Sequence, residues 1–517
     1  MKYFITFVFA CLSISATCYS QEELLVIGDK LDGTELKAAC YTFPERIQTF
    51  SVDSSLDSLY LHLRETTKNG KYLKNRGEIA LYHITDREFV WKVPVDYSKT
   101  YVNGTKDGIL FTTSNRVSFI DKKTGNILWE QMLFPVYKDE SLNLLLGYKN
   151  AVSQKLRAVR LTDGMELWQT KVAHEYGWNQ VYSLDGAKRL VVADDICEFD
   201  LLTGSSKVYE AKTGIKDVKS MVLQGLMAVA TGVATGVASG GTFGYSYVPV
   251  SSNVMSGLVS NVCMQDSCYY VADRNNMMCL DQHLQPVWEY EFPDKTASSS
   301  VLFMQDDNIY MLNYGFGWKD GMRKVKSGRP FIAGFDRRSG QQLFFNRLSL
   351  KKDIVEDAFV AEDAVYMLFD DGLAYQALTD SVVNITPWNN MEERGKLQGL
   401  LSDTLYAFIP ERREFVPLAF DGVNCPVYTD KGKVYVVDKE LEIKQEYLSE
   451  LLYFVRFRMN DYLCVCRGND YWFLHKLGMP VAHFCLDIRQ GAVVGNKLLM
   501  LTEENQLLLI DLDEAVM

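Results

Sequence analysis

Histidine, cysteine and acidic residues are the side chains of this sequence that could bind a metal ion or activate a nucleophile. The six histidines are His62, His83, His174, His283, His475 and His483. No two of them are four residues apart, the spacing that brings two imidazoles to one face of a helix. Cys464 and Cys466 would face the same side of a strand, but the partner pair that a zinc site needs does not follow them. We therefore predict no metal site and no catalytic residue.

The short signatures of common enzymes are also missing from the sequence. It contains no Gly-x-Ser-x-Gly elbow of a serine hydrolase and no Gly-Lys-Ser or Gly-Lys-Thr phosphate loop. Paired carboxylates for glycoside cleavage cannot be recognised among 66 Asp and Glu residues. A protein built from repeats can assemble a site from separate segments, so an enzyme stays an alternative, but the sequence favours a non-catalytic chain.

The elements that would carry these side chains follow a repeated phrase. An apolar strand runs into a turn marked by Asp and Gly, and a second strand with a large apolar residue follows. The clearest copies cover residues 117–129, 161–168 and 199–204. They recur about every 40 residues, a period that indicates stacked β-sheets, each of which buries its apolar face against a neighbour.

Each residue type in the phrase has a physical reason. The Gly stands where a short hairpin loop needs positive φ, and an Asp four residues before it can accept hydrogen bonds from the turn. A large side chain four residues after the Gly, such as Trp129, can fill the space between adjacent sheets. Arg160 replaces the Asp in one copy, so the Asp is helpful rather than obligatory. The predicted structural repeat residues are Asp121, Gly125, Trp129, Gly164, Trp168, Asp200, Gly204, Trp288, Asp336 and Gly340.

These repeats resemble those of the PQQ-like propellers, the group that contains quinoprotein dehydrogenases and BamB-type outer-membrane assembly lipoproteins. The resemblance rests on residues 121–129, 162–168, 200–204 and 336–340. It implies an all-β fold, a single β-propeller of four-stranded blades whose ring is closed by strands from both termini. About eight blades are favoured, and the chain length also fits about seven to ten.

The resemblance raises the question of a quinone cofactor. Quinoprotein dehydrogenases typically place two adjacent cysteines beside the quinone, together with carboxylates and an Asn that hold calcium. No two cysteines are adjacent here, and Cys464 and Cys466 could not form a vicinal disulfide. We therefore predict no cofactor.

The first 20 residues have the composition of a secretory signal peptide. Met1-Lys2 precedes an apolar run from Tyr3 to Leu12, and small residues follow as far as Ser20. Residues 21–517 would then form the propeller. Cys18 could instead be lipidated, but the residues before it match a lipoprotein signal poorly, so soluble export is favoured. This predicts an exported protein of the periplasm or outer membrane, with secretion as an alternative.

An uncharged segment at about residues 221–265 interrupts the repeat. Its small residues recur at every fourth position, and aromatic residues follow them. The residues concerned are Gly232, Gly236, Gly240, Phe243, Tyr245 and Tyr247. We interpret the segment as a Gly- and Ala-rich loop or hairpin packed on the propeller. A contact surface for a protein or a membrane and a membrane-spanning segment are the alternatives.

The net charge and the repeats together indicate which classes of function fit this sequence. The net charge is −12 without a basic run, which argues against nucleic-acid binding. Repeat folds more often supply a surface than a reaction, so we predict a non-catalytic binding or scaffold propeller of the bacterial envelope. Its partner would be an envelope protein, and the resemblance suggests a role in outer-membrane protein assembly. The alternatives are a secreted enzyme acting on a sugar, an alcohol or a polymer, and a protein tethered to the membrane by residues 221–265.

Overall fold

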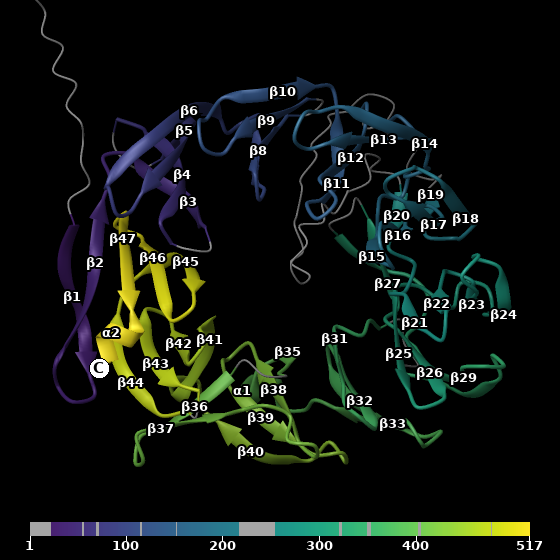
Figure 1. The fold of residues 1–517 in the computed structure, drawn as a ribbon. Helices are drawn as coiled ribbons and strands as arrows, with labels where there is room; N and C mark the ends of the chain where they lie inside the picture. The colour runs from purple at the N-terminus through teal and green to yellow at the C-terminus, as the bar shows by residue number, and fades with distance from the viewer. Residues whose placement is uncertain are drawn as a thin grey trace, which may run out of the picture. The chain divides into compact units, whose positions relative to one another are not determined.

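The computed structural model describes residues 22–53, 56–68, 72–113, 116–150, 152–216, 254–319, 323–348, 353–401, 405–476 and 478–516. These residues form 47 β-strands and two short α-helices, α1 (Met391–Arg394) and α2 (Leu512–Val516), besides one 3₁₀ turn at Ser449–Leu451 (Figure 1). The predicted all-β class is confirmed. Neither described helix has the length and apolar character needed to traverse a bilayer. The predicted signal peptide and the six insert residues from Gly232 to Tyr247 lie outside the described residues.

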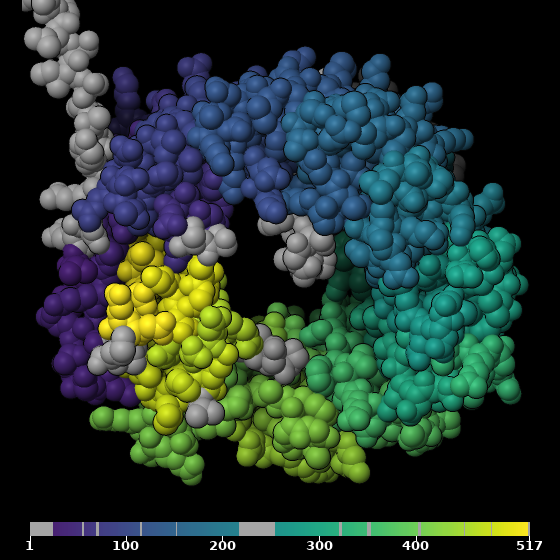
Figure 2. Space-filling view, viewed as in Figure 1, coloured from purple at the N-terminus to yellow at the C-terminus, as the bar shows by residue number. Residues whose placement is uncertain are grey.

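The chain divides into two compact units, residues 1–98 with 456–517 (unit 1) and residues 99–455 (unit 2). Unit 2 consists mainly of four-stranded antiparallel sheets, whose order in space follows the chain in most cases. Consecutive sheets of unit 2 lie side by side in Figure 1, and their side chains form a continuous surface in Figure 2.

The first three sheets of unit 2 each consist of four consecutive strands. They are β7 (Tyr101–Gly104), β8 (Gly108–Thr112), β9 (Val117–Asp121) and β10 (Ile127–Gln131); β11 (Phe134–Asp139), β12 (Leu144–Tyr148), β13 (Lys155–Arg160) and β14 (Glu166–Lys171); and β15 (Gln180–Ser183), β16 (Lys188–Val192), β17 (Ile196–Asp200) and β18 (Ser206–Tyr209). A fourth sheet is assembled from strands distant in sequence, β19 (Ile215–Lys216), β20 (Val254–Ser256), β27 (Phe316–Lys319) and β28 (Arg323–Lys326).

Four further sheets complete the four-stranded series of unit 2 in the described residues. They are β21 (Cys263–Gln265), β22 (Cys268–Ala272), β23 (Asn276–Leu280) and β24 (Pro286–Glu291); β25 (Ser300–Gln305), β26 (Asn308–Asn313), β29 (Phe331–Asp336) and β30 (Gln342–Arg347); β31 (Asp357–Val360), β32 (Ala364–Phe369), β33 (Gly372–Ala377) and β34 (Val383–Pro387); and β35 (Leu397–Leu400), β38 (Cys425–Thr429), β39 (Val434–Val437) and β40 (Ile443–Tyr447). The hairpin of β36 (Leu405–Ile409) and β37 (Glu414–Pro417) pairs with β41 (Leu452–Arg458).

Unit 1 joins both ends of the chain. One sheet is β3 (Arg46–Val52), β4 (Ser58–Thr66), β5 (Leu73–His83) and β6 (Glu88–Asp96). The other strands of this unit are β1 (Glu22–Lys30), β2 (Glu35–Thr42), β42 (Tyr462–Arg467), β43 (Asp470–His475), β44 (Pro480–Cys485), β45 (Ile488–Val494), β46 (Lys497–Thr502) and β47 (Gln506–Asp511). The amino-terminal β2 pairs antiparallel with the carboxy-terminal β47, with Cys40 opposite Leu508. Strands from both ends of the chain therefore share a sheet, while the number of blades stays a prediction.

The core lies between neighbouring sheets because the central strands of several sheets are buried on both faces. Every residue of β12 and of β32 is buried. One cluster joins Leu146 and Tyr148 of β12 with Val191 of β16 and Phe199 of β17. No sheet could hide both apolar faces alone, so burial of apolar surface ties each sheet to its neighbours.

The same backbone hydrogen bond is present in the turn of all four copies of the repeat. The N–H of Gly125, Gly164, Gly204 or Gly340 donates to the carbonyl oxygen four residues earlier, over 2.8–2.9 Å. In the second copy this acceptor belongs to Arg160, and it is as well placed as the carbonyls of the three Asp residues. The backbone bond does not depend on the side chain, which explains why the Asp can be replaced.

Where the Asp is present, its side chain adds further hydrogen bonds to the turn. Asp121 accepts hydrogen bonds from Thr124 N–H at 2.6 Å, Thr124 Oγ1 at 2.8 Å and Lys123 N–H at 2.9 Å. These bonds, those from Thr124 first, lower the pKa of Asp121 below its usual 3.8. Because the charged form is the one that is bound, its contribution to stability is complete above pH 3.8 and disappears as the pH falls through the lowered pKa.

We therefore expect Asp121→Asn to reduce the pH dependence of stability. The difference in free energy of unfolding between the wild type and this variant should be largest near neutral pH and shrink as the pH falls below about 4. Urea unfolding at a series of pH values measures it. A difference that stays constant down to the lowest pH, or that grows in acid, would contradict the assignment.

Candidate functional site

The predicted repeat residues meet across neighbouring sheets. The indole Nε1–H of Trp129 donates to the carbonyl oxygen of Leu161 at 2.6 Å, in the turn of the next sheet. Trp168 makes the same bond to Leu201 at 2.7 Å. We call this contact between a Trp and the following turn the sheet latch.

The glycine of the next turn completes the sheet latch. Gly164, Gly204 and Gly340 have φ values of 71°, 73° and 72°. A Cβ at these positions would lie only 2.6–2.7 Å from the indoles of Trp129, Trp168 and Trp288. The turn thus needs glycine for its backbone conformation and for the space that the ring occupies. The sequence indicated the first requirement; the second depends on packing between sheets.

The same outer strands carry a β-bulge directly before the large residue. The register shifts so that Leu128, Val287 and Leu343 have no direct partner on the inner strand. Their exposed fractions are 51%, 56% and 50%. We call them the outer bulge residues, and they place an aliphatic side chain at equivalent positions of three sheets. A bulge changes the direction in which a side chain projects, and these three aliphatic side chains are about half exposed to solvent.

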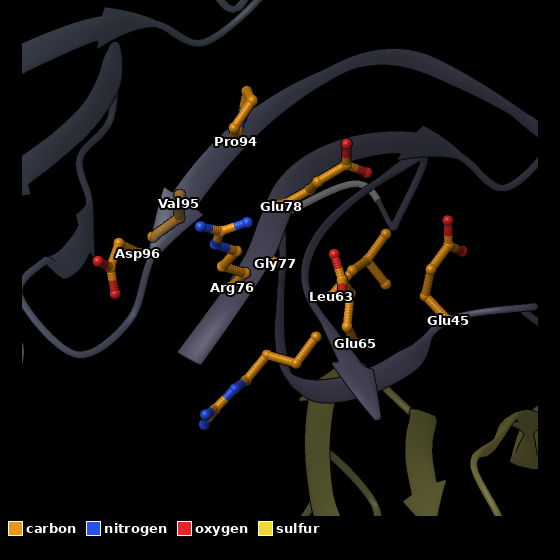
Figure 3. Close-up of a pocket in the computed structure, with 10 residues that line it drawn as sticks. Glu45, Leu63, Glu65, Arg76, Gly77, Glu78, Pro94, Val95 and Asp96 are labelled. Carbon is orange, nitrogen blue, oxygen red and sulfur yellow. The ribbon is translucent and has the colours of Figure 1, made fainter. Parts of the chain in front are cut away.

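Unit 1 contains a charged cavity of about 510 Å³. Its lining residues come from β4, β5, β6 and the segment before β3 (Figure 3). They are Glu45, Leu63, Arg64, Glu65, Arg76, Gly77, Glu78, Pro94, Val95 and Asp96. The lining therefore carries both carboxylates and guanidinium groups.

Three of the four acidic residues that line the charged cavity pair with lysines. Lys92 lies 2.9 Å from Glu45 and 3.7 Å from Glu78, and Lys74 lies 2.7 Å from Glu65. The hydrogen bond from Lys74 lowers the pKa of Glu65. A general acid for glycoside cleavage needs a raised pKa. The lowered pKa of Glu65 is the opposite of what a general acid needs.

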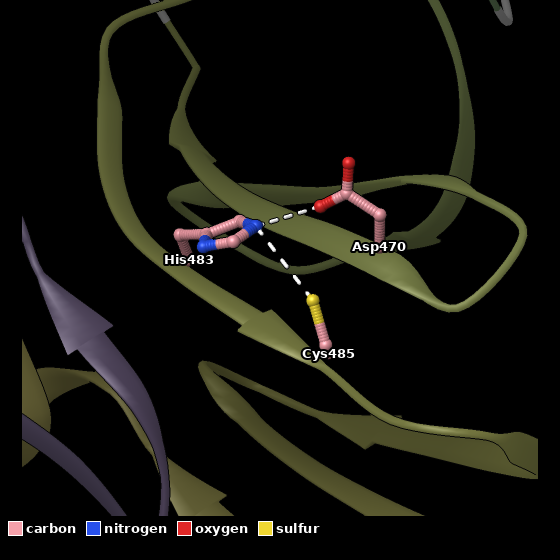
Figure 4. A group of neighbouring side chains, drawn as sticks. All are labelled: Asp470, His483 and Cys485. Carbon is pink, nitrogen blue, oxygen red and sulfur yellow. Dashed lines mark hydrogen bonds and ion pairs between the residues drawn. The ribbon is translucent and has the colours of Figure 1, made fainter.

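A second group of chemically capable residues lies on β43 and β44. Asp470, His483 and Cys485 offer ligand atoms that are all within 4.8 Å of one another (Figure 4). His483 Nε2 is 2.7 Å from Asp470 Oδ1 and 4.0 Å from Cys485 Sγ. The six histidines are scattered in the sequence, and their spacing did not predict this group. The available signal was the spacing His483-Phe484-Cys485 on one strand, but Asp470 could be added only with the strand register.

The arrangement is not that of a nucleophilic triad. In a triad the thiol and the carboxylate approach opposite nitrogens of the imidazole. Here both approach Nε2 of His483. Desolvation and the charge of Asp470 raise the pKa of Cys485, which disfavours the thiolate nucleophile. The three ligand atoms lie close enough together that one metal ion could contact all of them.

Comparisons with known proteins give similarity in structure alone. No protein-family model and no curated protein matches this sequence. Among solved structures, BamB from Moraxella catarrhalis is 11% identical with a TM-score of 0.27, over 79% of this chain and 95% of BamB. A europium-containing methanol dehydrogenase is 10% identical with a TM-score of 0.30, over 80% of this chain and 84% of the enzyme. The described chain is an all-β array made mainly of four-stranded antiparallel sheets.

Proposed function

We propose that this protein is an exported, non-catalytic binding propeller of the bacterial envelope. The sheet latch is the observation that carries the proposal. Trp129 and Trp168 bond to the turn of the following sheet, and the glycines there leave room for the rings. The residues that recur in this chain thus hold sheets together. An array fixed in this way presents a broad, rigid surface, which is what repeat proteins commonly use for binding.

The location and the class of partner rest on the sequence. Residues 1–20 have the order of a secretory signal, and the repeats resemble those of BamB-type proteins. We therefore propose an envelope protein of outer-membrane assembly as the partner. The outer bulge residues are the contact positions to probe first, because they expose aliphatic side chains at equivalent places on three sheets.

Site-specific photo-crosslinking in intact cells tests this proposal. A crosslinking amino acid placed at Leu128, Val287 or Leu343 is expected to capture one and the same outer-membrane assembly protein. Gln341 is a matched control, since it is exposed and lies two residues before Leu343. Adducts should be weak at Gln341 and should be identified by mass spectrometry. Absence of an envelope protein at all three positions, or equal capture at Gln341, would contradict the proposal.

A further inference from the structure

Strand register places Asp470, His483 and Cys485 on one face of the sheet in unit 1. Asp470 is directly opposite Cys485 across the β43–β44 pair, and Trp472 is opposite His483. Residues two apart on a strand share a face, so all these side chains project from the same side. On the other side of β44, Asp29 of β1 is opposite His483 and adds another carboxylate to this face.

We propose that Asp470, His483 and Cys485 bind a divalent transition-metal ion, with zinc as the best fit. Sγ of Cys485, Nε2 of His483 and Oδ1 of Asp470 would be the protein ligands. Thiolate and imidazole favour zinc or cobalt over magnesium and calcium, which prefer oxygen alone. One thiolate and one carboxylate also balance the two positive charges of the ion.

The distances require only small movements. Ligands at 2.0–2.3 Å from a tetrahedral zinc ion lie roughly 3.3–3.8 Å from one another. The 4.0 Å between Cys485 Sγ and His483 Nε2 is close to that range. The 2.7 Å hydrogen bond between Asp470 and His483 must open by less than about 1 Å, a change that side-chain rotation can supply. Water would take the fourth position, because the group faces solvent and Cys485 is exposed.

Neighbouring residues hold the ligands in place. The His483 ring packs on the Trp472 ring with 4.5 Å between their centroids. Arg467 Nη2 lies 3.3 Å from Oδ2 of Asp470, so Oδ1 is the oxygen directed at His483. Residues on paired strands are positioned more accurately than residues on loops, and such supporting contacts strengthen metal sites.

Cobalt(II) titration of the full chain without its first 20 residues tests the proposal. One equivalent of cobalt is expected to produce a thiolate-to-metal charge-transfer band in the near ultraviolet, and zinc should displace it. Cys485→Ser should abolish the band, and His483→Ala should weaken binding by more than about 100-fold, since even supporting residues are worth 10–100-fold. Circular dichroism checks that the variants are folded.

The chain supplies a matched control for the histidine variant. His83 Nδ1 lies 3.3 Å from Asp86 Oδ2 and forms a histidine–carboxylate pair in the same unit. Among the described residues, no cysteine groups with this pair. His83→Ala should leave cobalt binding unchanged. A second measurement needs no variant. Zinc should slow the alkylation of Cys485, and mass spectrometry of the peptide that contains Cys485 measures the rate. Absence of the charge-transfer band, its survival in Cys485→Ser, or zinc-independent alkylation of Cys485 would overturn the proposal.

Discussion

Replacing Asp139 by asparagine is expected to lower the free energy of unfolding by about 3–5 kcal/mol, among the largest effects of any single substitution in this chain. Asp139 on β11 forms an ion pair with Arg189 on β16, and the two side chains are 6% and 7% exposed. Tyr137 joins them, since it donates to Asp139 at 3.3 Å and accepts from Arg189 Nε at 3.2 Å. The substitution would leave the Arg189 charge buried between two sheets with no counter-charge.

The physical reason is that desolvation is expensive for a charge that has lost its partner. Burial acts to raise the pKa of Asp139, but hydrogen bonds from Ser141 and Arg189 outweigh it and the pKa is lowered overall. The carboxylate is therefore held in its charged form by these partners. The double variant Asp139→Leu with Arg189→Met removes both charges and should recover most of the lost stability.

Urea unfolding followed by tryptophan fluorescence measures these differences. The control is Asp163→Asn, because Asp163 and Arg160 form an exposed pair at 2.8 Å in the same sheet as Asp139. An exposed pair contributes about 0–1 kcal/mol, so this control should change little. Equal losses for Asp139→Asn and Asp163→Asn would show that burial of the network is not what matters.

Replacing Gly204 by alanine is expected to destabilise unit 2 by roughly 2–5 kcal/mol. About 1–2 kcal/mol comes from forcing a residue with a Cβ into a left-handed conformation. The rest comes from steric conflict, because the new Cβ would stand 2.6 Å from Trp168 Cδ2. Relief would require the ring to move and would weaken its hydrogen bond to Leu201.

Gly186 separates the two contributions. It lies in the same sheet with a φ of 62°, and a Cβ built on it meets no atom within 4 Å. Gly186→Ala should therefore show the conformational cost alone, about 1–2 kcal/mol. Urea unfolding or thermal melting of both variants measures the difference. Equal destabilisation at the two positions would mean that the contact with Trp168 contributes nothing.

The repeat could be recognised in the sequence because its causes are local. Gly125, Gly164, Gly204 and Gly340 were predicted to need positive φ, and all four have it. The all-β class followed from short apolar runs between turns, since strand formation depends on residues close in sequence. The backbone bond from each of these glycines to the carbonyl four residues earlier lies wholly within one turn.

The candidate site could not be predicted in the same way. His483 and Cys485 are close in sequence, but Asp470 reaches them only through the register of β43 with β44. Likewise, Arg189 meets Asp139 because two whole sheets pack together. The metal ligands proposed here therefore rest on the geometry of β43 and β44, because residue spacing predicted none.

The amino-acid order alone sufficed for the class of the elements and the turns between them, because backbone preference and side-chain alternation act over a few residues. Contacts between sheets, such as Trp168 on Gly204, and the grouping of Asp470, His483 and Cys485 were settled by packing and register. The contact between Asp470 and His483, for example, joins residues 13 positions apart in the sequence. Residue preferences over a short window do not show which distant side chains will be in contact. These contacts between distant residues therefore become known only from the tertiary structure.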